Sequence, residues 1–289
     1  GGTLRLGNGG TGGNLLGNIR ITNGSRLVYN HSNMATYDGV ISSNGSVEID
    51  GGTLGGVLFN AANTYTGTTS ITVGTLRYGI NAAVAAGSPM VLNSTGTLDL
   101  NGFSGTVAAL NDGAGGGGLI TSGTSVAVTF TVSSTSINST FNGLITDGSG
   151  TLSLVKAGAG TTLTLGNILN SYSGGTRIAG GNLFVDDLAA LGTGPVTFAG
   201  GTLLTSTTGP FTFAVEIAGN TTYSGATTQT FDSTGVINVI ANASLTNAIG
   251  AGQVVLEDGL VRRGSLTLTG VHSGVLHGTV FDGDYRGRT

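Results

Sequence analysis

The residue types that carry out most enzyme chemistry are sparse in this sequence. Its 289 residues include 14 acids, 3 histidines and no cysteine. Glycoside hydrolysis needs two carboxylates at a set separation on one face, and lyase chemistry commonly adds a lysine or arginine beside clustered acids. Two adjacent acid pairs, Asp186-Asp187 and Glu257-Asp258, would point to opposite faces of a strand. We interpret both pairs as solvated turn residues, with a cation site or a carbohydrate contact as the alternative.

The basic and nucleophilic residues form no catalytic pattern either. The middle of the chain holds few bases, namely Arg77, Lys156 and Arg177. No G-x-S-x-G stretch offers a nucleophilic serine. His31 is far in sequence from His272 and His277, and we interpret all three histidines as structural turn residues. The sequence therefore predicts a protein that is not an enzyme and has no catalytic residue.

Two glycine-rich stretches, Gly7–Gly12 and Gly113–Gly118, match the G-x-G-x-x-G pattern of dinucleotide-binding loops. With 55 glycines such matches are expected by chance, and the second stretch leads into the strand-like Leu119-Ile120-Thr121 rather than into a helix. Calcium-binding repeats need a recurring aspartate, which the stretch Gly9–Asn14 lacks. We expect no cofactor-binding residue, no metal site and no cofactor.

The composition predicts a chain that is nearly all β. Glycine makes up 55 of the 289 residues, and glycine inside a helix costs about 0.5–1 kcal/mol relative to alanine. Hydrophobic residues make up 38% of the chain, which is enough to form a core, while charged residues make up only 8%. Low charge suits strands that stack equivalent residues about 4.8 Å apart, because like charges would repel there. With a net charge of −4 and no basic stripe, nucleic-acid binding is not expected.

Leucines recur at fixed steps along the chain. One evenly spaced series contains Leu54, Leu76, Leu98 and Ile120, and a second series, with a slightly shorter step, contains Leu163, Leu183 and Leu203. Several of these leucines follow a glycine and a threonine. The steps predict a parallel β-solenoid of roughly 20–22 residues per coil, in which glycine lies at a corner, threonine points out and leucine points in.

A second type of series marks another corner, with an aromatic residue two positions before a glycine. Its best copies, Asn63–Gly67 and Asn170–Gly174, lie several predicted coils apart. We predict a turn in which the glycine has positive φ, the asparagine bonds its own backbone and the ring covers the coil edge. After each copy comes an Ala-rich piece, residues 80–86 or 187–191, which we expect to form one helical turn or a wide loop.

The stretch that contains the second corner resembles a known family. The pattern G-A-G-T-x-x-L-x-L-x-G-x-x-x-x-Y-S-G-G-T-x-I-x-x-G-x-L, with L-G-x-G-P-V-x-x-x-G-G-T-L after it, looks like the autotransporter-associated β-strand repeat, also called the passenger-associated transport repeat. The matching residues are Gly158–Thr161, Leu163, Leu165, Tyr172–Thr176, Ile178, Leu183, Leu191–Val196 and Gly200–Leu203. The resemblance is good over residues 156–204 and fair over 57–100. It implies a right-handed parallel β-helix that is exported and displayed on, or released from, a bacterial surface, and it carries over no catalytic residue.

Together these observations predict one right-handed parallel β-helix domain over residues 1–289, an all-β fold. The chain begins at Gly1 without a secretion segment, so we expect a processed part of a longer exported protein at the bacterial cell surface or outside the cell. The expected role is structural or adhesive, as a surface stalk, a filament subunit or an autotransporter-type passenger. The alternative is a carbohydrate-active β-helix enzyme, either a polysaccharide lyase or a hydrolase.

The expected partners are other copies of the chain, glycans or a host surface. A coil at the end of a β-solenoid presents an unpaired strand edge, and Gly1–Leu6 already has the repeat pattern, so we predict end-to-end or lateral assembly into fibres. The Ala-rich stretch Ile80–Ala86 is far too short to cross a bilayer, and no membrane insertion is expected. Specific binding is expected where the pattern breaks, at Gly113–Gly118, Asp186-Asp187 and Asp282–Thr289.

Overall fold

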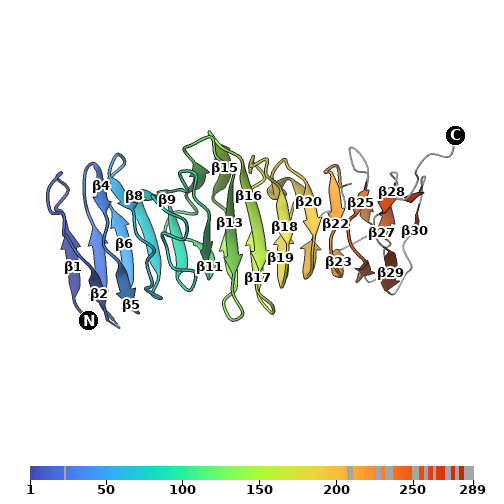
Figure 1. Cartoon of the computed structure of the whole chain (residues 1–289), viewed down its shortest axis with the longest axis horizontal. Helices are drawn as coiled ribbons and strands as arrows, with labels where there is room; N and C mark the ends of the chain where they lie inside the picture. The colour runs from blue at the N-terminus through green and yellow to red at the C-terminus, as the bar shows by residue number, and fades with distance from the viewer. Residues whose placement is uncertain are drawn as a thin grey trace.

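A computed structural model describes the chain over residues 1–22, 24–206, 211–225, 229–231 and 237–248, and beyond these over 254–256, 260–262, 265–270, 275–276 and 280–282. Within these residues the fold is all β apart from one 3-10 turn, η1 (Leu188–Leu191). Every pairing between its strands is parallel. Figure 1 shows the strands side by side along one long axis, from β1 at one end to β30 at the other.

The strands of the described residues form three long sheets and two short ones. The largest sheet contains β1 (Thr3–Leu6), β3 (Arg26–Tyr29), β4 (Met34–Tyr37), β6 (Ser46–Asp50), β7 (Gly56–Phe59), β8 (Thr69–Tyr78), β9 (Pro89–Asp99), β11 (Ala109–Asp112), β12 (Leu119–Ser122) and β15 (Leu144–Gly148). The second contains β10 (Gly105–Val107), β13 (Val128–Ser133), β16 (Leu152–Ala157), β18 (Thr176–Ile178), β20 (Val196–Phe198), β22 (Val215–Ile217), β25 (Ile237–Val239), β28 (Leu260–Arg262) and β31 (Val280–Asp282). The third contains β14 (Ser139–Phe141), β17 (Thr162–Leu165), β19 (Asn182–Val185), β21 (Thr202–Thr205), β23 (Thr221–Gly225), β26 (Ala243–Asn247) and β29 (Leu266–Gly270). The short sheets pair β2 (Ile19–Ile21) with β5 (Ile41–Ser43), and β24 (Gln229–Phe231) and β30 (Val275–Leu276) with β27 (Val254–Leu256).

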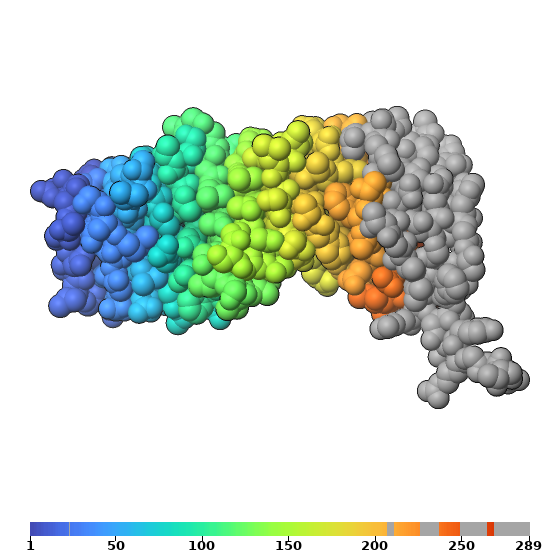
Figure 2. Space-filling model, turned by 90° about the horizontal axis from the view of Figure 1, so that it is seen from above, coloured from blue at the N-terminus to red at the C-terminus, as the bar shows by residue number. Residues whose placement is uncertain are grey.

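Each strand pairs with its equivalent in the next coil, which makes the chain a β-solenoid. In Figure 2 the colours follow one another in order along the long axis, so each coil contacts the coils next to it in sequence. The predicted column Leu163, Leu183 and Leu203 is confirmed, since these residues are direct register partners. The coil step varies more widely than predicted, because the coil from β20 to β22 is shorter than the predicted range and the coil from β10 to β13 is longer.

The prediction is wrong for one leucine of the other column, Leu54. Leu76 pairs with Leu98, and Leu98 with Ile120, as predicted, but the partner of Leu76 in the preceding coil is Val57 rather than Leu54. Leu54 lies in a turn after β6 and is 86% exposed. The even spacing therefore holds for this column only from Leu76 onward, because the turn moves the inward position from Leu54 to Val57.

The core is a column of inward side chains that runs through the coils. In β16 the burial alternates residue by residue, as expected for strands with one face on a core. Leu152 and Leu154 point inward and are fully buried, and they join a continuous cluster of leucine, valine, isoleucine, phenylalanine and tyrosine. Complete burial of one such side chain contributes roughly 1.5–3 kcal/mol. The repetition of this burial along the coils whose burial the structure describes stabilises the rod despite its glycine content.

The corners at Gly67 and Gly174 lie where the sequence predicts them, but the physical reason for glycine is different. Neither residue has positive φ. A Cβ atom on Gly67 would lie 2.2 Å from the carbonyl oxygen of Gly45, and one on Gly174 would lie 2.3 Å from Oγ of Ser153. Glycine is required because the neighbouring coil passes so close.

The corner asparagines also differ from the prediction, because they bond neighbouring coils instead of their own backbone. The Oδ1 atom of Asn170 accepts from the backbone N–H of Ile145 at 2.9 Å, and its Nδ2 atom donates to the carbonyl of Ala190 at 2.8 Å. Asn63, one sequence copy earlier, makes the same two kinds of bond with the coils on either side. Each asparagine thus connects three successive coils.

The corner tyrosines are fully buried, so their rings fill the core and do not cover the coil edge. The hydroxyl of Tyr172 lies 2.6 Å from Oγ1 of Thr176. That threonine donates its own proton to the carbonyl of Leu191 at 2.8 Å, so Tyr172 is the donor to Thr176. Tyr65 pairs with Thr69 at 2.7 Å in the first copy. In both copies the tyrosine hydroxyl thus has a hydrogen-bond partner inside an otherwise apolar core.

Candidate binding surfaces

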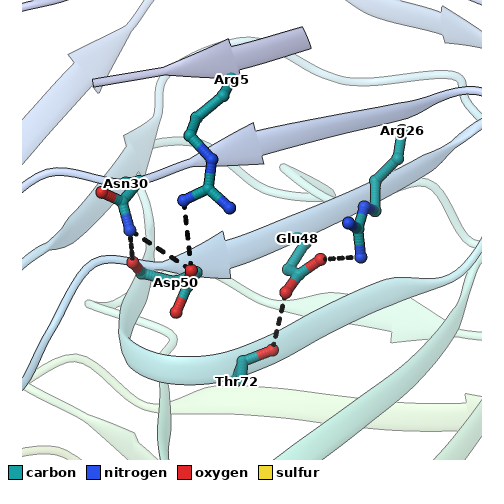
Figure 3. Close-up of polar contacts among 6 residues, drawn as sticks. All are labelled: Arg5, Arg26, Asn30, Glu48, Asp50 and Thr72. Atoms are coloured by element: carbon teal, nitrogen blue, oxygen red, sulfur yellow. Dashed lines mark hydrogen bonds and ion pairs between the residues drawn. The ribbon is translucent and has the colours of Figure 1, made fainter. Parts of the chain in front are cut away.

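Charged side chains gather on the outer face of the first coils, as Figure 3 shows. The guanidinium group of Arg26 on β3 contacts the carboxylate of Glu48 on β6 at 2.5 Å. The other carboxylate oxygen of Glu48 accepts from Oγ1 of Thr72 at 3.3 Å. The contacts join three successive coils. Because the side chain of Arg26 is half exposed, the ion pair contributes only about 0–1 kcal/mol.

A second ion pair lies beside the first (Figure 3). Arg5 on β1 reaches Asp50 on β6 at 3.3 Å, crossing β3, and Asn30 donates to both the carbonyl and the carboxylate of Asp50. Below them lies Val28, whose neighbours Leu27 and Tyr29 point into the core. Val28 therefore points outward, and yet it is fully buried. It lies in register between Arg5 and Glu48. The two pairs therefore cover an outward valine with the apolar parts of long side chains.

Sequence reasoning missed this cluster because its members come from separate coils. The step from Arg26 to Glu48 equals one predicted coil, and this step was the signal that could have revealed the pair. The same step relates Arg77 and Asp99, whose side chains meet at 2.8 Å. The side chain of Asp99 is only 6% exposed and also accepts two backbone N–H bonds at a corner. Arg77 therefore belongs to a structural ion pair.

Of the three basic residues in the middle of the chain, Arg77, Lys156 and Arg177, only Lys156 is buried. Its Nζ atom donates to the carbonyl oxygens of Ala157 at 2.5 Å, Gly158 at 3.1 Å and Gly180 at 3.3 Å, and lies 3.4 Å from Oγ1 of Thr161. Burial lowers the pKa of the Lys156 ammonium group. The amino group thus ties the turn after β16 to the corresponding turn of the next coil.

A surface hollow of about 920 Å³ lies along one corner of the rod, between the turns of three successive coils. We call it the η1 hollow, and its lining includes Ile168, Ser173, Asp187, Pro195, Thr212 and Phe213. Asp187 begins the 3-10 turn η1, which confirms a helical turn in the second Ala-rich piece. Its Oδ1 atom accepts from the N–H of Ala189 at 2.8 Å, as an N-cap does.

The predicted acid pair Asp186-Asp187 is exposed in a turn, as interpreted from the sequence. The two carboxylates have different surroundings. Asp187 lines the η1 hollow, whereas Asp186 accepts from the hydroxyl of Ser206 at 2.9 Å and is not among the lining residues. The second predicted pair, Glu257-Asp258, lies outside the described residues.

The remaining predicted positions do not converge on a site. The stretch 113–118 is a tight turn in which Gly113 faces Gly116. A Cβ atom on Gly113 would lie 1.7 Å from Oδ1 of Asn93, so this glycine serves close packing, whereas Gly116 has positive φ and open space around it. His31 is buried with neither ring nitrogen hydrogen-bonded, and its burial lowers its pKa. Among the described residues no three His, Asp or Glu side chains lie together as metal ligands would. His272, His277 and residues 283–289 lie outside the described part.

The stacked parallel coils define the class of the chain as a β-solenoid. The chain is 40% identical over 151 residues, or 51% of its length, to the protein named adhesin BmaC autotransporter from Brucella suis biovar 1 (strain 1330). It spans only 4% of that protein. No family model and no solved structure matches the chain. Over the described residues, no helix has the length and apolar character needed to span a membrane.

Proposed function

We propose that this chain is a segment of an exported bacterial surface protein that acts as an adhesive passenger of the autotransporter type. The observation that carries the proposal is the 40% identity to an autotransporter adhesin, over half of a chain that forms a β-solenoid. The repeat-like stretch at residues 156–204 supports the same assignment. The expected location is the bacterial cell surface or the space outside the cell.

The mechanism we propose is mechanical display. Inward leucine columns and corner residues such as Asn170 and Tyr172 hold the coils together. Each coil contacts only its neighbours, so the outer faces and turns stay free to contact a partner. Like charges would repel if they were stacked from coil to coil, which fits a chain with only 8% charged residues. The rod carries its binding surfaces away from the cell.

The test is adhesion by the purified chain itself. Beads coated with the chain should bind monolayers of cultured animal cells more strongly than beads coated with an unrelated protein of similar size and net charge. Pre-incubation of the cells with the soluble chain should compete with the beads. Equal binding of the two kinds of bead, without competition, would refute an adhesive role for this segment.

The carbohydrate-active enzyme is the second candidate, and among the described residues the cluster at Glu48 and Asp50 is the place that fits it best. Both acids lie on one strand beside two arginines, which is the gathering that an enzyme needs. However, ion pairs already occupy both carboxylates and connect neighbouring coils. The scaffold role is therefore better supported. Release of reducing ends from a panel of neutral and acidic polysaccharides would favour the enzyme.

Association of the chain with itself stays a prediction. Sedimentation velocity of the purified chain at micromolar concentration measures it directly. Concentration-dependent species larger than the monomer would support assembly into fibres, and a monomer at every concentration would refute it. Adhesion by the beads does not depend on this outcome.

A further inference from the structure

The η1 hollow has the chemical character of a ligand site. It is formed by turns of three successive coils, around residues 168–173, 187–195 and 212–214. Its volume of about 920 Å³ falls within the range of about 300–1,000 Å³ that is usual for small-molecule sites. The hollow lies beside the second Ala-rich piece, which forms η1 within a coil that keeps the predicted length.

Apolar side chains form part of the lining. Ile168 is 56% exposed, although most isoleucines of the described part are buried. Phe213 is partly buried, and its ring lies edge-on against Phe211 at a centroid distance of 6.1 Å. Pro195 is exposed nearby. Flat apolar surfaces of this kind bind the C–H faces of a ring-shaped ligand.

The polar part of the lining combines hydroxyl groups with one carboxylate. Asp187 uses Oδ1 to cap η1, and within the described residues its second oxygen has no partner. Thr212 and Ser173 add hydroxyl groups, of which that of Ser173 donates to Asp147 at 2.6 Å. The lining contains no lysine, arginine or histidine. An acceptor of this kind suits a ligand that donates hydrogen bonds and carries no negative charge.

An extended peptide fits the hollow less well than a sugar. Peptides that bind β-proteins usually add a strand to an unpaired sheet edge. The strands next to the hollow, β18 and β20, are paired on both sides, so they offer no such edge. A neutral oligosaccharide combines apolar ring faces with hydroxyl donors, which is the complement of this lining.

We propose that the η1 hollow binds a neutral oligosaccharide, with Asp187 accepting from sugar hydroxyls and Phe213 packing against a ring face. The proposal rests on the adhesive function proposed above and names the chemical class that the rod would recognise. The negative charge of Asp187 disfavours sulfated glycans, uronic acids and phosphates as ligands.

The experiment uses an array of neutral and anionic glycans, followed by calorimetric titration with the neutral oligosaccharide that binds best. The unchanged chain should bind neutral glycans. Asp187→Asn keeps an N-cap residue but removes the charged acceptor, and it should weaken binding about tenfold. The matched control, Asp186→Asn, changes the neighbouring acid outside the hollow and should leave binding unchanged. Far-UV circular dichroism checks that each variant folds.

A second variant tests the same proposal if Asp187→Asn does not fold. Ala189 is exposed in the lining, so Ala189→Trp should fill the hollow and abolish binding without disturbing the core. Three results would overturn the proposal: no neutral glycan bound at about 1 mM, a preference for anionic glycans or for peptides, or affinity unchanged in both variants. Bead adhesion that survives these results would leave the adhesive function standing, and glycan binding without adhesion would refute only that function.

Discussion

Replacing Asn170 with alanine removes a side chain that bonds two neighbouring coils at once. Its amide satisfies the N–H of Ile145 at 2.9 Å and the carbonyl of Ala190 at 2.8 Å. Both of these residues are buried. After the substitution the two buried backbone groups lose the side chain that pairs them.

The expected loss of stability follows from the two hydrogen bonds that the substitution removes. A buried donor or acceptor that loses its partner costs about 1–3 kcal/mol, so Asn170→Ala should lower the free energy of unfolding by about 2–6 kcal/mol. Asn167 provides a matched control in the same turn. It also makes two side-chain hydrogen bonds, to Leu169 and Asn142, but it lies partly exposed, where water can replace the lost amide. Asn167→Ala should cost only about 0.5–1.5 kcal/mol.

The assay is urea-induced unfolding followed by far-UV circular dichroism. If the dependence on urea concentration keeps its slope, the shift in midpoint reports the change in stability. Asn63→Ala should reproduce the large shift in a different part of the rod, because Asn63 makes equivalent bonds. Equal small shifts for Asn170→Ala and Asn167→Ala would refute the reasoning that burial, and not the number of bonds, sets the cost.

Three further predictions test other contacts. Gly181→Ala should lower the melting temperature of the chain far more than Gly160→Ala. Both glycines have positive φ, but only a Cβ atom on Gly181 would meet backbone oxygens, at 2.4 Å and 2.6 Å. Burial lowers the pKa of His31 below its usual value of 6.5, so the unfolded chain binds more protons than the folded chain below about that pH. Stability should therefore fall as the pH falls through this range, and the midpoint of urea unfolding against pH should flatten in His31→Leu. Tyr172→Phe should cost about 0.5–1.5 kcal/mol in urea unfolding because it removes the bond to Thr176, and no measurable loss would contradict that bond.

Much of the fold could be predicted because a solenoid repeats its environment. Leu163, Leu183 and Leu203 occupy the same inward position in successive coils, so the requirement for burial appears in the sequence as a fixed step. Leu54 shows the limit of this reasoning. It keeps the spacing of its column but lies in a turn, and Val57 takes the inward place. Spacing alone does not distinguish an inserted turn residue from a strand residue.

The candidate surfaces were less accessible to sequence reasoning. Asp187 was singled out as a turn acid with carbohydrate contact as an alternative, but the hollow beside it depends on turns from three coils. The pair of Arg5 and Asp50 crosses an intervening strand, and its separation in the sequence is not one coil step. Neither arrangement has a local signal.

The sequence by itself determined the all-β class, the approximate coil length and the positions of the corners, because every coil must bury the same face and turn at the same places. The tertiary structure decided what the polar residues do. The same asparagine can bond its own turn or two neighbouring coils, and Lys156 can be solvated or enclosed by carbonyl groups. These outcomes depend on how closely neighbouring coils approach one another, which residue type and spacing do not specify.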